Sequence, residues 1–104
     1  MVKYPLLGQL VSSASGRDRG HHYLVVGQEA DRVLVADGAR RKLEDPKRKN
    51  PLHLQWRRER DRELGEKLEA DEKVTNSELR GALIKLLELE NNTTPSRGGE
   101  EKLG

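Results

Sequence analysis

The sequence predicts a small, mostly β domain followed by an α-helical extension. Between Gly8 and Gln55, short runs of β-branched and aromatic residues alternate with turn residues, a pattern typical of an all-β unit. After Trp56 the pattern changes to charged residues and then to apolar residues at helical spacing. Only 33% of the 104 residues are apolar and 37% are charged, so we expect a small core with solvated appendages.

Five short strands are expected in the first half. Glu29-Ala30-Asp31 predicts a tight reversal, and Asp37-Gly38 predicts a hairpin because this pair readily adopts positive φ angles. Residues 44–51 contain two prolines, which remove donors from a strand ladder, so they predict a basic loop. The expected strands are residues 8–13, 23–28, 32–36, 41–43 and 52–55.

Strands this short favour a strongly curved barrel, because closure shields the sheet edges and a few side chains fill the interior. We expect this unit to occupy residues 1–56. Its predicted interior residues are Leu10, Tyr23, Val25, Val33, Val35, Leu43 and Leu54.

The second half is expected to be helical. Residues 57–74 read as a charged helical linker, with Glu63 and Lys67 spaced as an i,i+4 pair. Thr75-Asn76-Ser77-Glu78 has the form of a capping box, which predicts an amphipathic helix over residues 75–91. Its apolar face is expected to cover the barrel, to pair with its own copy or to bind a partner. Residues 92–104 have the composition of a disordered tail.

The cysteine content and the charge distribution limit the expected cellular environment and the expected partners of the chain. The chain has no Cys, so disulfides and thiolate zinc sites are excluded, and a cytoplasmic location is expected. Pro5 and Gly8 interrupt the apolar residues at the N-terminus, so neither a signal peptide nor a membrane span is expected. Residues 1–62 hold 14 Lys and Arg against 8 Asp and Glu, whereas residues 63–104 hold 6 against 10. The basic first half is the part expected to meet polyanions.

Three basic clusters fall within the predicted barrel. The loop Gly16-Arg17-Asp18-Arg19-Gly20 places two guanidinium groups, which suit phosphate oxygens, between glycines that allow close approach. Taken alone, this loop is equally well explained as an exposed polar hairpin. Arg40-Arg41-Lys42 and Lys47-Arg48-Lys49 lie on the same small unit, and together the clusters favour nucleic-acid binding. Trp56-Arg57-Arg58 could extend this surface, but Trp56 is better explained as a cap on the open end of the barrel that packs against the helical region.

Metal binding, catalysis and cofactor binding are not expected. His21 and His22 are adjacent and would point to opposite faces of a strand, and His53 lies far along the chain, so a metal site is not predicted. We find no local context for a nucleophile, no Walker or Rossmann glycine motif and no cofactor signal. The sequence therefore predicts a binding protein and not an enzyme.

Five segments in order carry a resemblance to a known family. Over residues 6–56 the chain resembles the KOW family and, within it, the ribosomal protein L14e-like RNA-binding proteins in their short bacterial form. The resemblance implies an SH3-like β-barrel, with Gly20 as the glycine typical of the motif, and an RNA-binding role linked to ribosomes or translation. The segments are Leu7-Gly8-Gln9-Leu10-Val11, Gly16–Gly20 with the run from Tyr23 to Val26, Leu34-Val35-Ala36-Asp37-Gly38, Arg40-Arg41-Lys42 and Leu52-His53-Leu54.

The function expected is an RNA-binding accessory protein that contacts rRNA or other structured RNA in translation or ribosome biogenesis. Ribosomal proteins are further possible partners, no membrane contact is expected, and the oligomeric state stays open. The alternative is a protein-interaction module of the transcription or translation machinery. One Trp, two Tyr and no Phe make an aromatic peptide groove a poor explanation for the barrel. The expected RNA contacts are Arg17, Arg19, Gly20, His21, His22, Arg40, Arg41, Lys42, Lys47, Arg48, Lys49, His53, Arg57 and Arg58.

Overall fold

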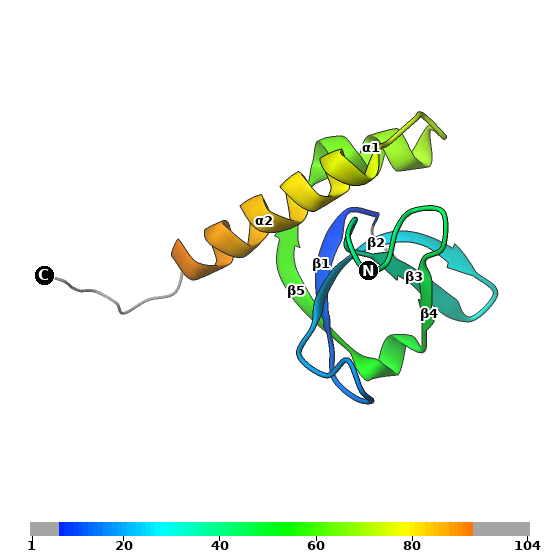
Figure 1. The fold of residues 1–104 in the computed structure, drawn as a ribbon, viewed down its shortest axis with the longest axis vertical. Coiled ribbons are helices and arrows are strands. Elements are labelled where there is room, and N and C mark those ends of the chain that lie inside the picture. The colour runs from blue at the N-terminus through cyan, green and yellow to red at the C-terminus, as the bar shows by residue number, and fades with distance from the viewer. Residues whose placement is uncertain (1–6, 93–104) are drawn as a thin grey trace, which may run out of the picture.

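One curved antiparallel sheet organises the chain, with the strand order β4-β3-β2-β1-β5 (Figure 1). The structure is a computed structural model that describes residues 7–92. A 3-10 helix, η1 (Pro51–His53), joins the two strands at opposite edges of the sheet. The strands are β1 (Gln9–Ser13), β2 (His22–Glu29), β3 (Arg32–Ala36), β4 (Lys47–Lys49) and β5 (Leu54–Arg60).

The pairing register explains how so short a chain builds five strands. β2 and β3 are joined by the two residues Ala30 and Asp31, with Glu29 opposite Arg32, so the predicted tight reversal is confirmed. Ala30 adopts a φ of 55° at this turn. β1 is flanked on both sides, because Val11 lies opposite Tyr23 of β2 and opposite Trp56 of β5.

Each face of the sheet carries its own apolar cluster, since alternate residues of a strand point to opposite faces. The helix-side cluster includes Leu10, Leu24 and Ala36 together with residues of both helices. Leu10 was expected in the interior, but it belongs to the helix-side cluster, and Val11 belongs to the cluster on the other face. Both positions can be apolar because β1 is buried along its whole length. Leu43 is only half-buried against the helix-side cluster. The interior cluster comprises Val11, Tyr23, Val25, Val33, Val35 and Leu54.

Two helices, α1 (Arg62–Glu69) and α2 (Asn76–Asn92), lie together on one side of the sheet (Figure 1). The predicted capping box is present: the Glu78 amide donates to Thr75 Oγ1, and the Thr75 amide donates to Glu78 Oε1, both at 3.1 Å. The face of α2 that carries Leu79 and Leu83 is buried against the sheet. Of the three uses left open for this helix, packing on the sheet is therefore the one that the structure shows.

Several predicted boundaries are wrong. The strand expected at residues 41–43 is part of a loop. The Asp37 carboxylate accepts hydrogen bonds from the amides of Ala39 and Arg41 and holds this wide loop in place of a tight hairpin. The returning strand is β4, which lies within the expected basic loop. The domain boundary expected after residue 56 falls inside β5, which continues because Arg60 pairs with Gln9 of β1.

No membrane contact was expected, and neither helix between residues 7 and 92 is both long and apolar enough to cross a membrane. Of the tail expected at residues 92–104, Asn92 is instead the last residue of α2, and the other residues lie outside the described part of the chain, as do the first six residues.

Candidate nucleic-acid interface

A cleft of about 500 Å³ opens where two loops and the start of β4 meet. One wall comes from the loop at residues 14–21, between β1 and β2, and the other from the loop at residues 37–46, between β3 and β4. Among the lining residues there are five Lys and Arg but a single carboxylate. The lining residues are Arg17, Asp18, Arg19, Gly20, His21, Tyr23, Arg40, Arg41 and Lys47.

Backbone geometry shapes the first wall. The Gly20 amide donates to the Ser13 carbonyl at 2.8 Å, and the Ser13 amide donates to the His21 carbonyl at 2.9 Å, so the base of the loop continues the pairing of β1 with β2. Gly20 has a φ of +86°, and a Cβ built there would touch nothing within 4 Å. The left-handed backbone, and not crowding, therefore requires glycine at this position. Arg17 and Arg19 are exposed on the loop that results.

Asp18 organises the floor of the cleft. Its carboxylate accepts hydrogen bonds from Tyr23 Oη at 2.7 Å and from Ser13 Oγ at 2.8 Å. The ammonium groups of Lys47 and Lys49 lie 3.0 and 3.3 Å from its two oxygens. Partial burial by itself would raise the pKa of Asp18, but the hydrogen bonds from Tyr23, Ser13, Lys47 and Lys49 outweigh it and hold the pKa well below its usual range. Asp18 therefore stays ionised.

Tyr23 links this floor to the interior of the sheet. Burial and the hydrogen bond to Asp18 both raise the pKa of the Tyr23 phenol. The hydroxyl thus stays protonated and keeps donating to Asp18. Sequence reasoning placed Tyr23 in the core and did not single out Asp18, although a carboxylate between two arginines in a basic loop was a usable signal.

His21 and Asp37 tie the two walls together. His21 Nε2 lies 2.7 Å from Asp37 Oδ2, while Asp37 Oδ1 accepts from the amides of Ala39 and Arg41. Burial would raise the pKa of Asp37, but the hydrogen bonds from His21 and from these two amides lower it, so the carboxylate remains charged. The His21 ring also rests against Tyr23, with ring centroids 4.7 Å apart and planes at 59°. These contacts fix the ring at the edge of the cleft.

The structure brings half of the expected contact residues together. Seven of them line the cleft, and Lys42 is exposed on the same loop as Arg40 and Arg41. Lys49 differs from its neighbours, because it is buried and its ammonium binds Ser13 and Asp18. We therefore assign Lys49 to the support of the cleft and not to its surface. The seven are Arg17, Arg19, Gly20, His21, Arg40, Arg41 and Lys47.

The other expected contacts are dispersed. Arg48 is exposed but forms an ion pair with Glu29. Arg57 on β5 lies 3.4 Å from Glu90 of α2. His22 is half-buried on β2, where burial lowers its pKa. His53 in η1 and Arg58 on β5 are exposed outside the cleft.

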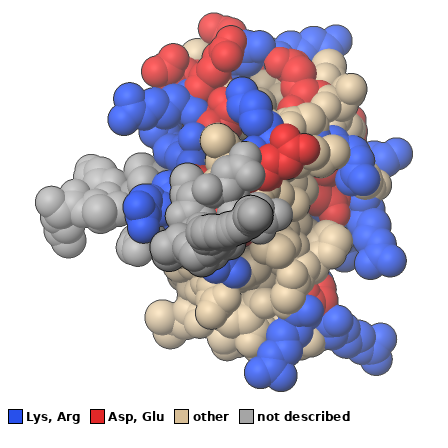
Figure 2. Space-filling view, turned by 90° about the vertical axis from the view of Figure 1, so that its left-hand side faces the viewer, with Lys and Arg blue, Asp and Glu red and all other residues tan. Residues whose placement is uncertain are grey.

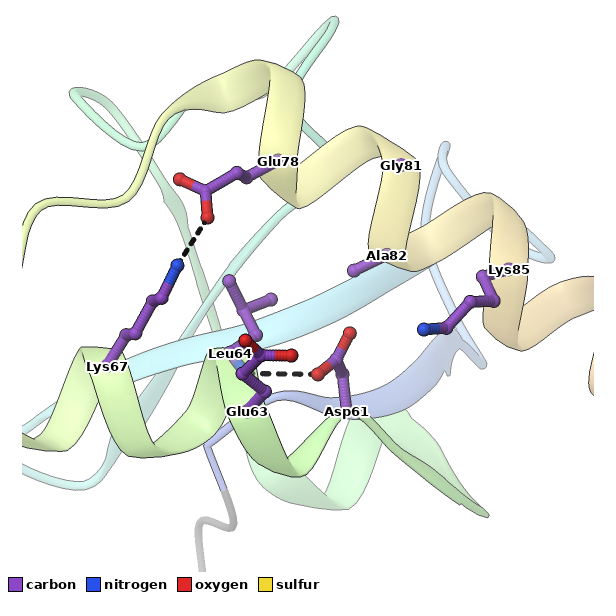
Figure 3. Close-up of a pocket in the computed structure, with 8 residues that line it drawn as sticks. All are labelled: Asp61, Glu63, Leu64, Lys67, Glu78, Gly81, Ala82 and Lys85. Carbon is purple, nitrogen blue, oxygen red and sulfur yellow. Dashed lines mark hydrogen bonds and ion pairs between the residues drawn. The ribbon is translucent and has the colours of Figure 1, made fainter.

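A second hollow of about 300 Å³ lies between the two helices. Lys67 of α1 forms an ion pair with Glu78 of α2 at 2.8 Å at one end of the hollow, and Leu64 and Ala82 are its apolar lining residues (Figure 3). Its charges are mixed, and Figure 2 shows the same interspersion of acidic and basic side chains toward the top, where the helices lie in Figure 1. This hollow lacks the excess of positive charge that distinguishes the cleft.

Comparisons with known proteins add no relative. No protein-family model matches the chain, and no curated protein is significantly similar to it. The resemblance to the KOW and L14e-like proteins therefore rests on the sequence segments themselves, and the cleft has to be interpreted from its own chemistry.

Proposed function

We propose that the chain is an RNA-binding accessory protein of translation or ribosome biogenesis, and that the cleft contacts rRNA or other structured RNA. The observation that carries this proposal is the convergence of Arg17, Arg19, Arg40, Arg41 and Lys47 from three segments on one cleft. In the same proposal, the curved sheet is an SH3-like barrel of the KOW type. The order of the basic clusters and the mostly β fold with its C-terminal helix support this assignment.

Electrostatics explain why the cleft would attract a polyanion. Within residues 7–92, Asp18 is the only acid that lines it, and its charge is matched by the ammonium groups of Lys47 and Lys49. Arg41 lies 3.5 Å from the exposed carboxylate of Asp45, whereas Arg17, Arg19 and Arg40 have no ion pair within residues 7–92. These three arginines therefore present uncompensated charge, and guanidinium groups donate in a fork that fits phosphate oxygens. Neutralising phosphates releases counterions, so affinity should depend steeply on salt.

The alternative, a protein-interaction module, would have used the apolar face of α2 as its main binding surface. The apolar face of α2 is covered by the sheet, and the large apolar side chains left exposed between residues 7 and 92 are separate in the chain: Leu52, Ile84 and Leu89. A few exposed apolar residues are common on protein surfaces. The basic cleft is the stronger candidate for a binding site.

The test is the affinity of the full chain for a structured rRNA-like RNA, measured by fluorescence anisotropy between 50 and 200 mM salt. The logarithm of the association constant should fall linearly with the logarithm of salt concentration, by about 0.7–0.9 for each phosphate neutralised. The variant Arg17→Glu with Arg40→Glu should weaken binding at least about tenfold and make the salt dependence shallower.

The matched control is Arg62→Glu with Lys73→Glu, which makes the same change in net charge at exposed positions on α1 and the following loop. This control should retain near wild-type affinity. Equal losses in both double variants would mean that only net charge matters. Wild-type affinity that does not respond to salt would overturn the proposal.

A further inference from the structure

We propose that the cleft takes a single unpaired nucleotide, bulged or looped out of an RNA helix, and that His21 is the platform on which its base stacks. This inference rests on the proposed function and specifies the RNA class for the same site. Three features carry it: the hollow shape, the two opposed basic walls and the fixed ring of His21.

The shape of the site favours an object that enters it. A continuous RNA duplex presents a convex backbone, and proteins recognise such duplexes mainly by contacts to phosphates and 2′-hydroxyls across a shallow groove. A flat or ridged basic surface would suit that task. A cleft of about 500 Å³ instead falls in the range of sites that enclose a small ligand, and one extruded nucleotide is a ligand of this size.

The distribution of charge matches the same ligand. Arg17 and Arg19 lie on one wall, and Arg40 and Arg41 lie on the other. A nucleotide that leaves the stack carries a phosphate on each side of its sugar, and the backbone must bend to extrude it. In the simplest arrangement, the arginines of each wall bind one of the two flanking phosphates.

His21 supplies the flat surface that a base requires. Its ring is held by the 2.7 Å bond to Asp37 and by contact with Tyr23, yet 34% of its side chain is exposed. Tyr23, the other aromatic residue that lines the cleft, is only 3% exposed and lies beneath it. Unpaired bases commonly stack on aromatic and histidine rings, and a ring that is already fixed loses little entropy when the base arrives.

The first experiment uses the wild-type chain with three RNAs. They are a fully paired hairpin, the same hairpin with one extra unpaired nucleotide, and the bulged hairpin with an abasic nucleotide at that position. We expect the bulged RNA to bind at least about fivefold more tightly than the paired RNA, in line with the contribution of one stacked base. The abasic RNA should lose most of this preference, because it keeps the phosphates and lacks the base.

The second experiment changes the platform. His21→Ala should abolish the preference for the bulged over the abasic RNA while retaining salt-dependent binding to all three RNAs. His53→Ala is the matched control, because it removes an exposed histidine outside the cleft. It should bind all three RNAs as the wild type does. The comparison of wild-type binding to bulged and abasic RNA stands even if His21→Ala fails to fold.

The possible failures are distinguishable. If the wild type binds the paired, bulged and abasic RNAs equally and still depends on Arg17 and Arg40, the nucleotide inference is overturned and the proposed function stands. If none of the three RNAs binds at low salt, both are overturned. A preference for the bulge that survives both the abasic substitution and His21→Ala would also overturn the role of His21.

Discussion

The hydroxyl of Tyr23 donates a 2.7 Å hydrogen bond to Asp18, and this bond joins the interior of the sheet to the loop that carries Arg17 and Arg19. Asp18 also binds Lys47 and Lys49, so one carboxylate connects β2, β4 and the first wall of the cleft. The stability of the fold and the shape of the basic cleft therefore depend on the same residue.

Replacing Asp18 by Ala should lower the free energy of unfolding by about 2–4 kcal/mol. The substitution leaves the ammonium of Lys49 buried without its counter-charge and deprives the Tyr23 hydroxyl of its acceptor. Urea denaturation followed by circular dichroism measures the change. Asp31→Ala, at a carboxylate whose side chain is 90% exposed, should stay within about 0.5 kcal/mol of wild type. Equal effects of the two substitutions would contradict the structural role of Asp18.

Stability should fall as the pH is lowered into the acid range. The pKa values of Asp18 and Asp37 are both lowered in the folded state, so between the folded and unfolded pKa values the unfolded chain binds more protons. Their contribution is fully present above the ordinary carboxyl pKa of 3.8 and is lost as pH falls below it. The Asp18→Asn variant should lose less stability than wild type between pH 6 and pH 3, as urea midpoints would show. Parallel curves for the two proteins would rule out this linkage.

Two helical glycines should respond to alanine in opposite directions. A Cβ on Gly81 of α2 would meet nothing within 4 Å, so Gly81→Ala should stabilise the protein by about 0.5–1 kcal/mol through helix propensity. A Cβ on Gly65 of α1 would lie 2.3 Å from the Leu7 carbonyl oxygen, so Gly65→Ala should destabilise by about 1–3 kcal/mol. Thermal or urea unfolding of the two variants measures whether each substitution stabilises or destabilises the protein. A stabilising effect of Gly65→Ala would mean that α1 does not pack against Leu7 in solution.

The packing of α2 can be tested with two adjacent residues. Leu83 is 5% exposed and belongs to the helix-side cluster, whereas Ile84 is 47% exposed. Leu83→Ala should cost about 2–4 kcal/mol of unfolding free energy, and Ile84→Ala less than about 1 kcal/mol. Hydrogen exchange should show faster opening of α2 amides in the first variant. Similar small losses at both positions would indicate a helix that is not docked.

Local signals predicted the elements that local interactions determine. Thr75 and Glu78 form the expected capping box, because that motif needs only four consecutive residues. The alternation of Val33 and Val35 with Leu34 and Ala36 identified β3 with its bounds. The reversal expected at Glu29-Ala30-Asp31 was equally evident, and the structure narrows it to Ala30 and Asp31 because Glu29 pairs with Arg32.

Long-range pairing accounts for the errors. Lys47 and Lys49 form a strand because they align with Val35 and Val33 and turn their ammonium groups toward Asp18, about thirty residues earlier in the chain. Periodicity also could not show that both faces of β1 are covered, so it assigned Leu10 to the wrong cluster. The basic clusters were visible in the sequence. The bond between His21 and Asp37 links the two loops of the cleft, and no local pattern reveals it.

The position of β1 between β2 and β5 has a consequence for the order of folding. Val11 pairs with Trp56, so one edge of β1 has no partner until the chain has been made at least as far as β5. The segments that form the basic cleft, from Ser13 to Lys49, leave the ribosome before that strand does. During synthesis the nascent chain therefore carries the basic residues of the cleft together with an open strand edge, and the edge closes only when β5 is added.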